Sequence, residues 1–175
     1  MKALLLILLT CTVTLAGEDT VTHRITGLFS PDREADLRRA LEKVTGVKLV
    51  SLNFAHAEGV FSYDAAVAFK DTKPEKIVER FNDAIRGLTN STLGIAPLYP
   101  LPKDKLTRLE ISVAGCDCKA CCLAAYESIS QIEGLAAAAV SFKEGRVTAL
   151  IDPAKTSRAA LEDALKRRGV TVVVP

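Results

Sequence analysis

The chain has 175 residues, of which 49% are hydrophobic and 25% are charged. This hydrophobic content excludes an intrinsically disordered protein, and the length allows one medium-sized core or two small ones. The 23 Lys and Arg residues balance 21 Asp and Glu residues, which leaves a net charge of +2. Because no basic run with interleaved aromatic residues is present either, we expect no nucleic-acid partner.

Residues 1–17 have the pattern of a secretory signal peptide. A short positive start precedes an apolar run over residues 3–9, and residues 14–16 form a small-x-small cleavage pattern. We therefore expect an exported protein, either periplasmic or secreted. Cys11 lies inside this segment, and we interpret it as part of the signal rather than as a lipidated cysteine, because Thr10 is a poor residue before a lipidation site. No later stretch reaches the roughly 20 apolar residues of a membrane-spanning helix, so we expect a soluble mature chain without a transmembrane segment.

The first half of the mature chain, residues 20–99, is predicted to form a strand, a helix, two strands, a helix and a strand. Apolar residues at helical spacing or in alternation define these elements. The expected elements are a strand 20–26, a helix opened by Pro31 with Ser30 as N-cap and stopped at Gly46, strands 47–54 and 60–69, a helix 74–86 closed by Gly87, and a strand 93–98.

The second half, residues 106–175, is predicted to repeat this order. Pro97, Pro100 and Pro102 cannot continue a sheet interior, so residues 100–105 are expected to be a linker. The expected elements are strands 107–114, 135–142, 146–151 and 170–174, a helix 119–131 with Gly134 as its stop, and a helix that starts at Thr156-Ser157 and is capped by Gly169.

The two halves align as an internal duplication. Gly27 falls on Gly115 and Gly46 falls on Gly134, both at an offset of 88 residues. Each half has the order βαββαβ, in which two helices cover one face of a four-stranded antiparallel sheet. We therefore predict an α+β protein of two tandem ferredoxin-like domains after the signal peptide.

Residues 116–122 hold four of the five cysteines and lie where a strand turns at Gly115 into a helix. In the CxxC formed by Cys118 and Cys121, one sulfur lies in the loop and the other on the first helical turn, so both can point at one ion. Thiolates are soft ligands that select Cu(I) and Zn(II), and by the same chemistry Hg(II) or Cd(II). A helix N-terminus and the neighbouring Lys119 both favour the thiolate form.

This stretch resembles the heavy-metal-associated domains of soluble copper chaperones, periplasmic mercury-scavenging proteins and the amino-terminal modules of metal-pumping ATPases. Their pattern is Gly-Met-Thr-Cys-x-x-Cys between the first strand and the first helix, and residues 115–121 here read Gly-Cys-Asp-Cys-Lys-Ala-Cys. The resemblance covers residues 106–175 and, more weakly, residues 20–98. It implies Cys118 and Cys121 as the metal ligands, and a membrane metal transporter or another thiol metal carrier as the partner.

Two residues depart from the pattern. Cys116 replaces the Met, which leaves open whether it packs under the loop or serves as a third ligand. Asp117 replaces the Thr; in the family an acidic residue there accompanies divalent soft metals such as Zn, Cd or Pb, although a turn-forming role is favoured over direct ligation. The family also places an aromatic residue or a Lys near the end of the second helix. Here residues 166–168 are Lys-Arg-Arg, which could compensate thiolate charge.

Other candidate residues are given structural roles. Cys122 points about 100° away from Cys121 on the helix, so we expect a small core residue or an edge thiol rather than a ligand. His23 and His56 are expected to be solvated or packed. At the offset of 88, Ser30 and Arg33 take the positions of Cys118 and Cys121 and cannot replace a thiolate pair. The first domain is therefore predicted to be degenerate, with a structural or docking role.

The sequence thus predicts an exported soft-metal-ion binding and transfer protein that performs no catalysis. Two alternatives stay open. Cys118 and Cys121 could cycle as a thiol–disulfide redox module, with Cys116 or Cys122 resolving mixed disulfides. The protein could also be an interaction protein in which the duplicated sheets form the binding surface and the thiols are incidental.

Overall fold

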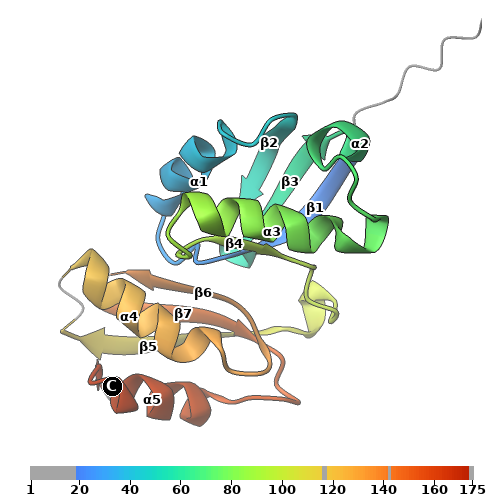
Figure 1. Ribbon diagram of the computed structural model, residues 1–175. Helices are drawn as coiled ribbons and strands as arrows, with labels where there is room; N and C mark the ends of the chain where they lie inside the picture. Colours follow the sequence, from blue (N-terminus) through green and yellow to red (C-terminus); the bar gives the residue numbers. More distant parts are fainter. Residues whose placement is uncertain (1–18, 116–117, 142, 174–175) are drawn as a thin grey trace, which may run out of the picture.

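The computed structural model describes residues 19–115, 118–141 and 143–173, and Figure 1 shows them as two domains in tandem. The predicted signal peptide with Cys11, and residues Cys116 and Asp117, lie outside this part of the chain. Both domains have the predicted βαββαβ order, and the first domain also contains short additional helices, which confirms the α+β fold and its duplication.

The first domain contains one antiparallel sheet with the strand order β2-β3-β1-β4. Its elements are β1 (Asp19–Thr26), α1 (Arg33–Leu41), β2 (Val47–Asn53), the 3-10 helix η1 (Phe54–His56), β3 (Glu58–Tyr63), α2 (Ala65–Ala68), the 3-10 helix η2 (Pro74–Lys76), α3 (Ile77–Leu88) and β4 (Gly94–Ala96). A 3-10 helix η3 (Lys103–Lys105) lies within the predicted linker.

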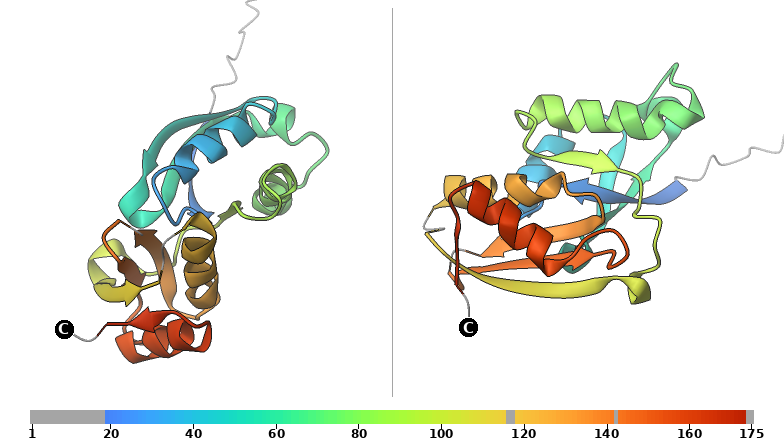
Figure 2. Two further views of the ribbon diagram at one scale, coloured as in Figure 1. Left: turned by 90° about the vertical axis from the view of Figure 1, so that its left-hand side faces the viewer. Right: turned by 90° about the horizontal axis from the view of Figure 1, so that it is seen from below.

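The second domain repeats the topology, with the strand order β6-β7-β5-β8. Its elements are β5 (Thr107–Ala114), α4 (Lys119–Ser130), β6 (Leu135–Ser141), β7 (Arg146–Ile151), α5 (Arg158–Arg167) and β8 (Thr171–Val172). Helices α4 and α5 pack against each other and against the sheet (Figure 2). Helix α5 starts where predicted, and Ser157 is its N-cap, because its hydroxyl accepts a hydrogen bond from the Ala160 N–H.

Helix α3 shows why the spacing of apolar residues predicted a helix in this segment. Its apolar residues recur at helical spacing, and Phe81 and Ile85 are fully buried against the first sheet. Burial of a large apolar side chain stabilises the fold by roughly 1.5–3 kcal/mol. This burial fixes α3 to one face of the first sheet.

The predicted strand 60–69 is wrong in its second half. Strand β3 ends at Tyr63, and Asp64 then caps the short helix α2 through a hydrogen bond from the Ala66 N–H to its carboxylate. A short apolar run does not by itself distinguish a strand from a helical turn, because periodicity needs more residues than this segment has.

Several predicted boundaries are also corrected. Ser30 does not cap α1, since its hydroxyl donates to the Asp32 side chain and Asp32 is the residue before the helix. Gly87 does not close α3, which continues to Leu88, and the chain reverses at Asn90 and Ser91 with positive φ. The predicted strand 93–98 shortens to β4, and within the described residues 170–173 the last predicted strand shortens to β8.

The two domains meet along β6, which is an edge strand of the second sheet. The Val140 N–H donates to the Phe29 carbonyl at 2.7 Å, so the first domain pairs with this otherwise open edge. Residues 136–139 of β6 are all alanine, and Ala137 packs in the hydrophobic core of the first domain. Small side chains allow this close approach, and the pairing protects an edge that would otherwise be open to other strands.

Within the described ranges, no helix is both long enough and apolar enough to span a bilayer.

Candidate metal centre

The predicted ligands lie at the start of α4, beyond the turn at Gly115. Gly115 has φ +79°, a left-handed conformation that glycine adopts without steric cost. Cys118 is the N-cap residue, with extended backbone, and its sulfur accepts a hydrogen bond from the Cys121 N–H at 3.2 Å. The helix N-terminus therefore presents N–H groups and a partial positive charge toward the sulfurs, which favours anionic thiolates there.

The structure brings Cys118 and Cys121 together. Their Sγ atoms lie 2.7 Å apart, which is longer than the bond of about 2.05 Å in a disulfide. Cys118 is exposed and Cys121 is half-buried, so the pair is reachable from solvent. This arrangement of two adjacent sulfurs at an open helix start is suited to holding a soft ion and to exchanging it.

Cys122 faces away from this pair. It is 2% exposed and lies in the hydrophobic core of the second domain with Ala125 and Ile129. Of the two roles expected for Cys122, a small core residue or an edge thiol, the burial corresponds to the core residue.

Cys116, the candidate third ligand, lies outside the described residues, as does Asp117. Among the residues that the structure does describe, no group of three or more His, Cys, Asp or Glu side chains is placed to hold a metal ion.

The equivalent loop of the first domain has the same backbone turn. Gly27 has φ +80°, and an added Cβ would lie 1.9 Å from the Thr92 carbonyl oxygen, so only glycine fits there. Arg33, at the position of Cys121, closes the loop by donating to the Thr92 hydroxyl at 2.6 Å and to the Asp36 carboxylate at 2.6 Å. A guanidinium occupies the place where the second domain has a thiol, as the alignment predicted.

This first-domain loop docks onto the second domain beside the cysteines. The Phe29 ring is 4% exposed and packs in the second domain's core, 5.6 Å from the Tyr126 ring. The Tyr126 hydroxyl accepts a hydrogen bond from the Gly27 N–H at 2.8 Å. The degenerate loop therefore has a docking role within the chain.

An ion pair connects the docked loop to the candidate site. Lys119, which lies between the two cysteines in sequence, pairs with Asp32. The hydrogen bond from Lys119, followed by one from Ser30, holds the pKa of Asp32 below its usual value. The same contact raises the pKa of Lys119. The first domain thus places a carboxylate next to the only basic residue within the CxxC.

The remaining predicted residues are not at the site. Residues 166–168 are all exposed, and Arg168 pairs with Glu127 at 4.0 Å. His23 is buried, hydrogen-bonded through Nε2 to the Tyr63 hydroxyl at 3.0 Å. His56 is half-buried, with Nδ1 3.2 Å from the Asn53 side-chain oxygen. Both histidines are therefore packed, as expected.

Sequence reasoning missed the residues that dock the two domains, namely Phe29, Asp32 and Tyr126. The aromatic residue two positions after Gly27 was a usable signal, because a large apolar side chain in a turn must be buried somewhere. Nothing local to residues 27–33 indicated that the burying partner is the other domain.

Comparisons with known proteins give structural similarities but no sequence family. No protein-family model matches the chain, and no curated protein matches it. Among solved structures, the CopZ metallochaperone is 27% identical over 38% of this chain and 100% of its own, with a TM-score of 0.38. Oxidised MerP from Ralstonia metallidurans CH34 is 30% identical over 39% of this chain and 96% of its own, with a TM-score of 0.38.

A third structure spans both domains. The N-terminal soluble domains of Bacillus subtilis CopA are 20% identical over 90% of this chain and 93% of their own, with a TM-score of 0.37.

Proposed function

We propose that this protein is an exported carrier that captures one soft metal ion with Cys118 and Cys121 and passes it on by thiolate exchange. The observation that carries the proposal is the adjacency of the two sulfurs, 2.7 Å apart at the exposed start of α4. The cargo is Cu(I), Hg(II), Zn(II) or Cd(II), the ions that thiolates select. The partner is a membrane metal transporter or another thiol metal carrier, and no step requires catalysis.

Ion binding requires the two sulfurs to separate. At a metal–sulfur distance of about 2.3 Å, two thiolates lie about 3.8 Å apart around a tetrahedral ion and about 4.6 Å apart across a linear one. Both distances exceed the 2.7 Å separation. Cys118 precedes the first helical residue and is exposed, so its side chain can move while Cys121 stays fixed by α4.

The direct test is titration of the reduced full-length chain with each of these ions, followed by native mass spectrometry. We expect one ion per chain, and we expect the double substitution Cys118→Ser and Cys121→Ser to abolish binding. Cys122→Ala is the matched control and should keep the ion, because Cys122 lies in the core. Stoichiometric binding by the double variant would contradict the proposal.

Cys116→Ser separates the two interpretations of that residue. A third ligand contributes to affinity, so its removal should weaken ion binding, whereas a residue that only packs under the loop should leave the affinity unchanged. The stoichiometry of one ion is expected in either case, because Cys118 and Cys121 remain.

A thiol–disulfide module is the second candidate, because the sulfurs of Cys118 and Cys121 are close enough to join with little movement. This function requires reduction of a disulfide substrate and a midpoint potential within the range of about −120 to −270 mV of catalytic dithiols. Turnover of such a substrate by the metal-free chain would favour the redox function over the carrier.

A further inference from the structure

Between the two domains lies a cavity whose described lining includes no cysteine. The cavity has a volume of about 560 Å³ and is bounded by β1 and the end of α3 on one side and by α4 and β6 on the other. Small-molecule sites typically have volumes of roughly 300–1,000 Å³ and favour domain interfaces. The polar residues that line this cavity include Arg24, Thr26, Arg86, Ser91, Glu127, Ser130 and Gln131.

Arg24 of β1 lines the cavity, and its guanidinium has N–H donors that are not fully used by hydrogen bonds within the described residues. Its Nη1 donates to the Leu135 and Ala136 carbonyls at 3.4 and 3.3 Å, both long distances for N–H···O bonds. Its Nε is buried, and no hydrogen-bond acceptor among the described residues contacts it. A guanidinium carries five N–H donors, and a buried donor left without an acceptor costs free energy. The site therefore lacks an acceptor at Arg24.

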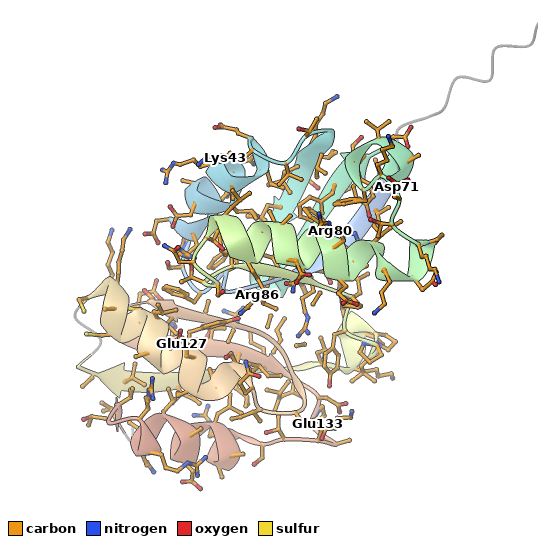
Figure 3. The ribbon with its side chains drawn as sticks, viewed as in Figure 1. Lys43, Asp71, Arg80, Arg86, Glu127 and Glu133 are labelled. Carbon is orange, nitrogen blue, oxygen red and sulfur yellow. The ribbon has the colours of Figure 1, made fainter. Side chains whose placement is uncertain are left out.

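Arg86 adds a second cation from the last turn of α3. Figure 3 labels Arg86 on α3 and Glu127 on the facing helix α4. Within the described part of the chain, neither Arg24 nor Arg86 forms an ion pair with a carboxylate. Glu127 also lines the cavity, and its carboxylate pairs at 4.0 Å with Arg168, which is outside the lining. With two guanidinium groups and one carboxylate, the described lining of the cavity keeps a net positive charge.

We propose that this cavity binds a small oxyanion, a molecule with carboxylate or phosphate oxygens, through the guanidinium groups of Arg24 and Arg86. A planar guanidinium matches two oxygens of such a group in a bidentate pair. Ser130 and Gln131 of the second domain supply a hydroxyl and an amide on the other wall. A ligand held by both walls stabilises the docked arrangement of the domains. This site is independent of the metal function proposed above.

Isothermal titration calorimetry with the reduced, metal-free full-length chain tests the proposal. Citrate, succinate and inorganic phosphate are the probes, each at constant ionic strength. We expect saturable binding of at least one probe, and which probe binds identifies carboxylate or phosphate as the preferred group. Arg86→Gln should weaken that binding about tenfold, because a charge-assisted hydrogen bond is lost.

Arg80→Gln is the matched control, because Arg80 lies on the same helix but does not line the cavity (Figure 3). It should bind the probe as the unmodified chain does. Arg24→Gln should weaken binding as Arg86→Gln does, and Arg86, being exposed on a helix, keeps the test valid if the Arg24 variant fails to fold. Absence of binding for all three probes, or equal weakening by Arg80→Gln and Arg86→Gln, would overturn the proposal.

Discussion

Replacing Phe29 with Ala tests whether the two domains form one cooperative unit. Phe29 belongs to the β1–α1 loop of the first domain, yet its ring is 4% exposed and packs in the core of the second domain. Phe-to-Ala substitutions in protein cores cost about 3–5 kcal/mol of unfolding free energy. Because a domain interface can partly close over the lost ring, we expect a loss near the lower end, about 3 kcal/mol.

Urea denaturation of the reduced full-length chain, together with amide hydrogen exchange, measures this effect. The Val140 amide is the informative probe, because its N–H donates to the Phe29 carbonyl across the interface. Phe29→Ala should accelerate exchange at Val140 and lower the urea midpoint. Phe69→Ala is the matched control: Phe69 is 5% exposed and packs only in the core of the first domain.

The reasoning fails if Phe29→Ala lowers the unfolding free energy by less than about 1 kcal/mol and leaves Val140 exchange unchanged, since a core Phe carries more than that. Such a result would mean that the loop rests on the second domain without anchoring it. An equal acceleration at Val140 in the Phe69 variant would also refute it, because the effect would then reflect general destabilisation rather than the docked loop.

Two further predictions concern pH and charge. Burial lowers the folded-state pKa of His23 below 6.5, so below that pH the unfolded chain binds more protons than the folded chain. The free energy of unfolding should therefore decrease as pH falls from about 6.5 toward the folded-state pKa. Urea unfolding at several pH values should show this decrease, which His23→Gln should remove and the control His56→Gln should retain. Removing the carboxylate with Asp32→Asn leaves Lys119 uncompensated beside the thiolates, so competitive metal titration should give a few-fold tighter binding at low salt that disappears at high salt. Glu34→Gln is the control for that change, because Glu34 pairs with Arg38 on the same helix, and an equal effect there would contradict the role of the Lys119 contact.

Much of the fold could be predicted because its signals are local. Left-handed turns favour glycine, and Gly27, Gly46, Gly115 and Gly134 all have positive φ where the duplicated frame placed them. The amphipathic spacing of apolar residues predicted the main helices, because this signal is also local in the sequence. Gly87 shows the limit of this signal, since a glycine without positive φ lies within the last turn of α3 and does not end it.

Only part of the candidate site could be predicted from the sequence. The sequence places Cys118 and Cys121 at a strand-to-helix turn, and the structure shows their sulfurs side by side. The neighbours of that turn come from residues about 90 positions earlier in the chain, through Asp32 and Phe29. Contacts of this kind depend on how two completed domains dock, so no local pattern of charge or hydropathy reports them.

The docked loop explains why only one copy of the turn carries thiols. An exchangeable metal site must be reachable by an incoming thiolate, and Cys118 is exposed. The same turn in the first domain is covered by the second domain, with Gly27 hydrogen-bonded to Tyr126 and Phe29 buried. One loop cannot be buried at an interface and remain open for ligand exchange. Arg33 then serves a purpose that a thiol cannot, because its guanidinium fastens the covered loop to Thr92.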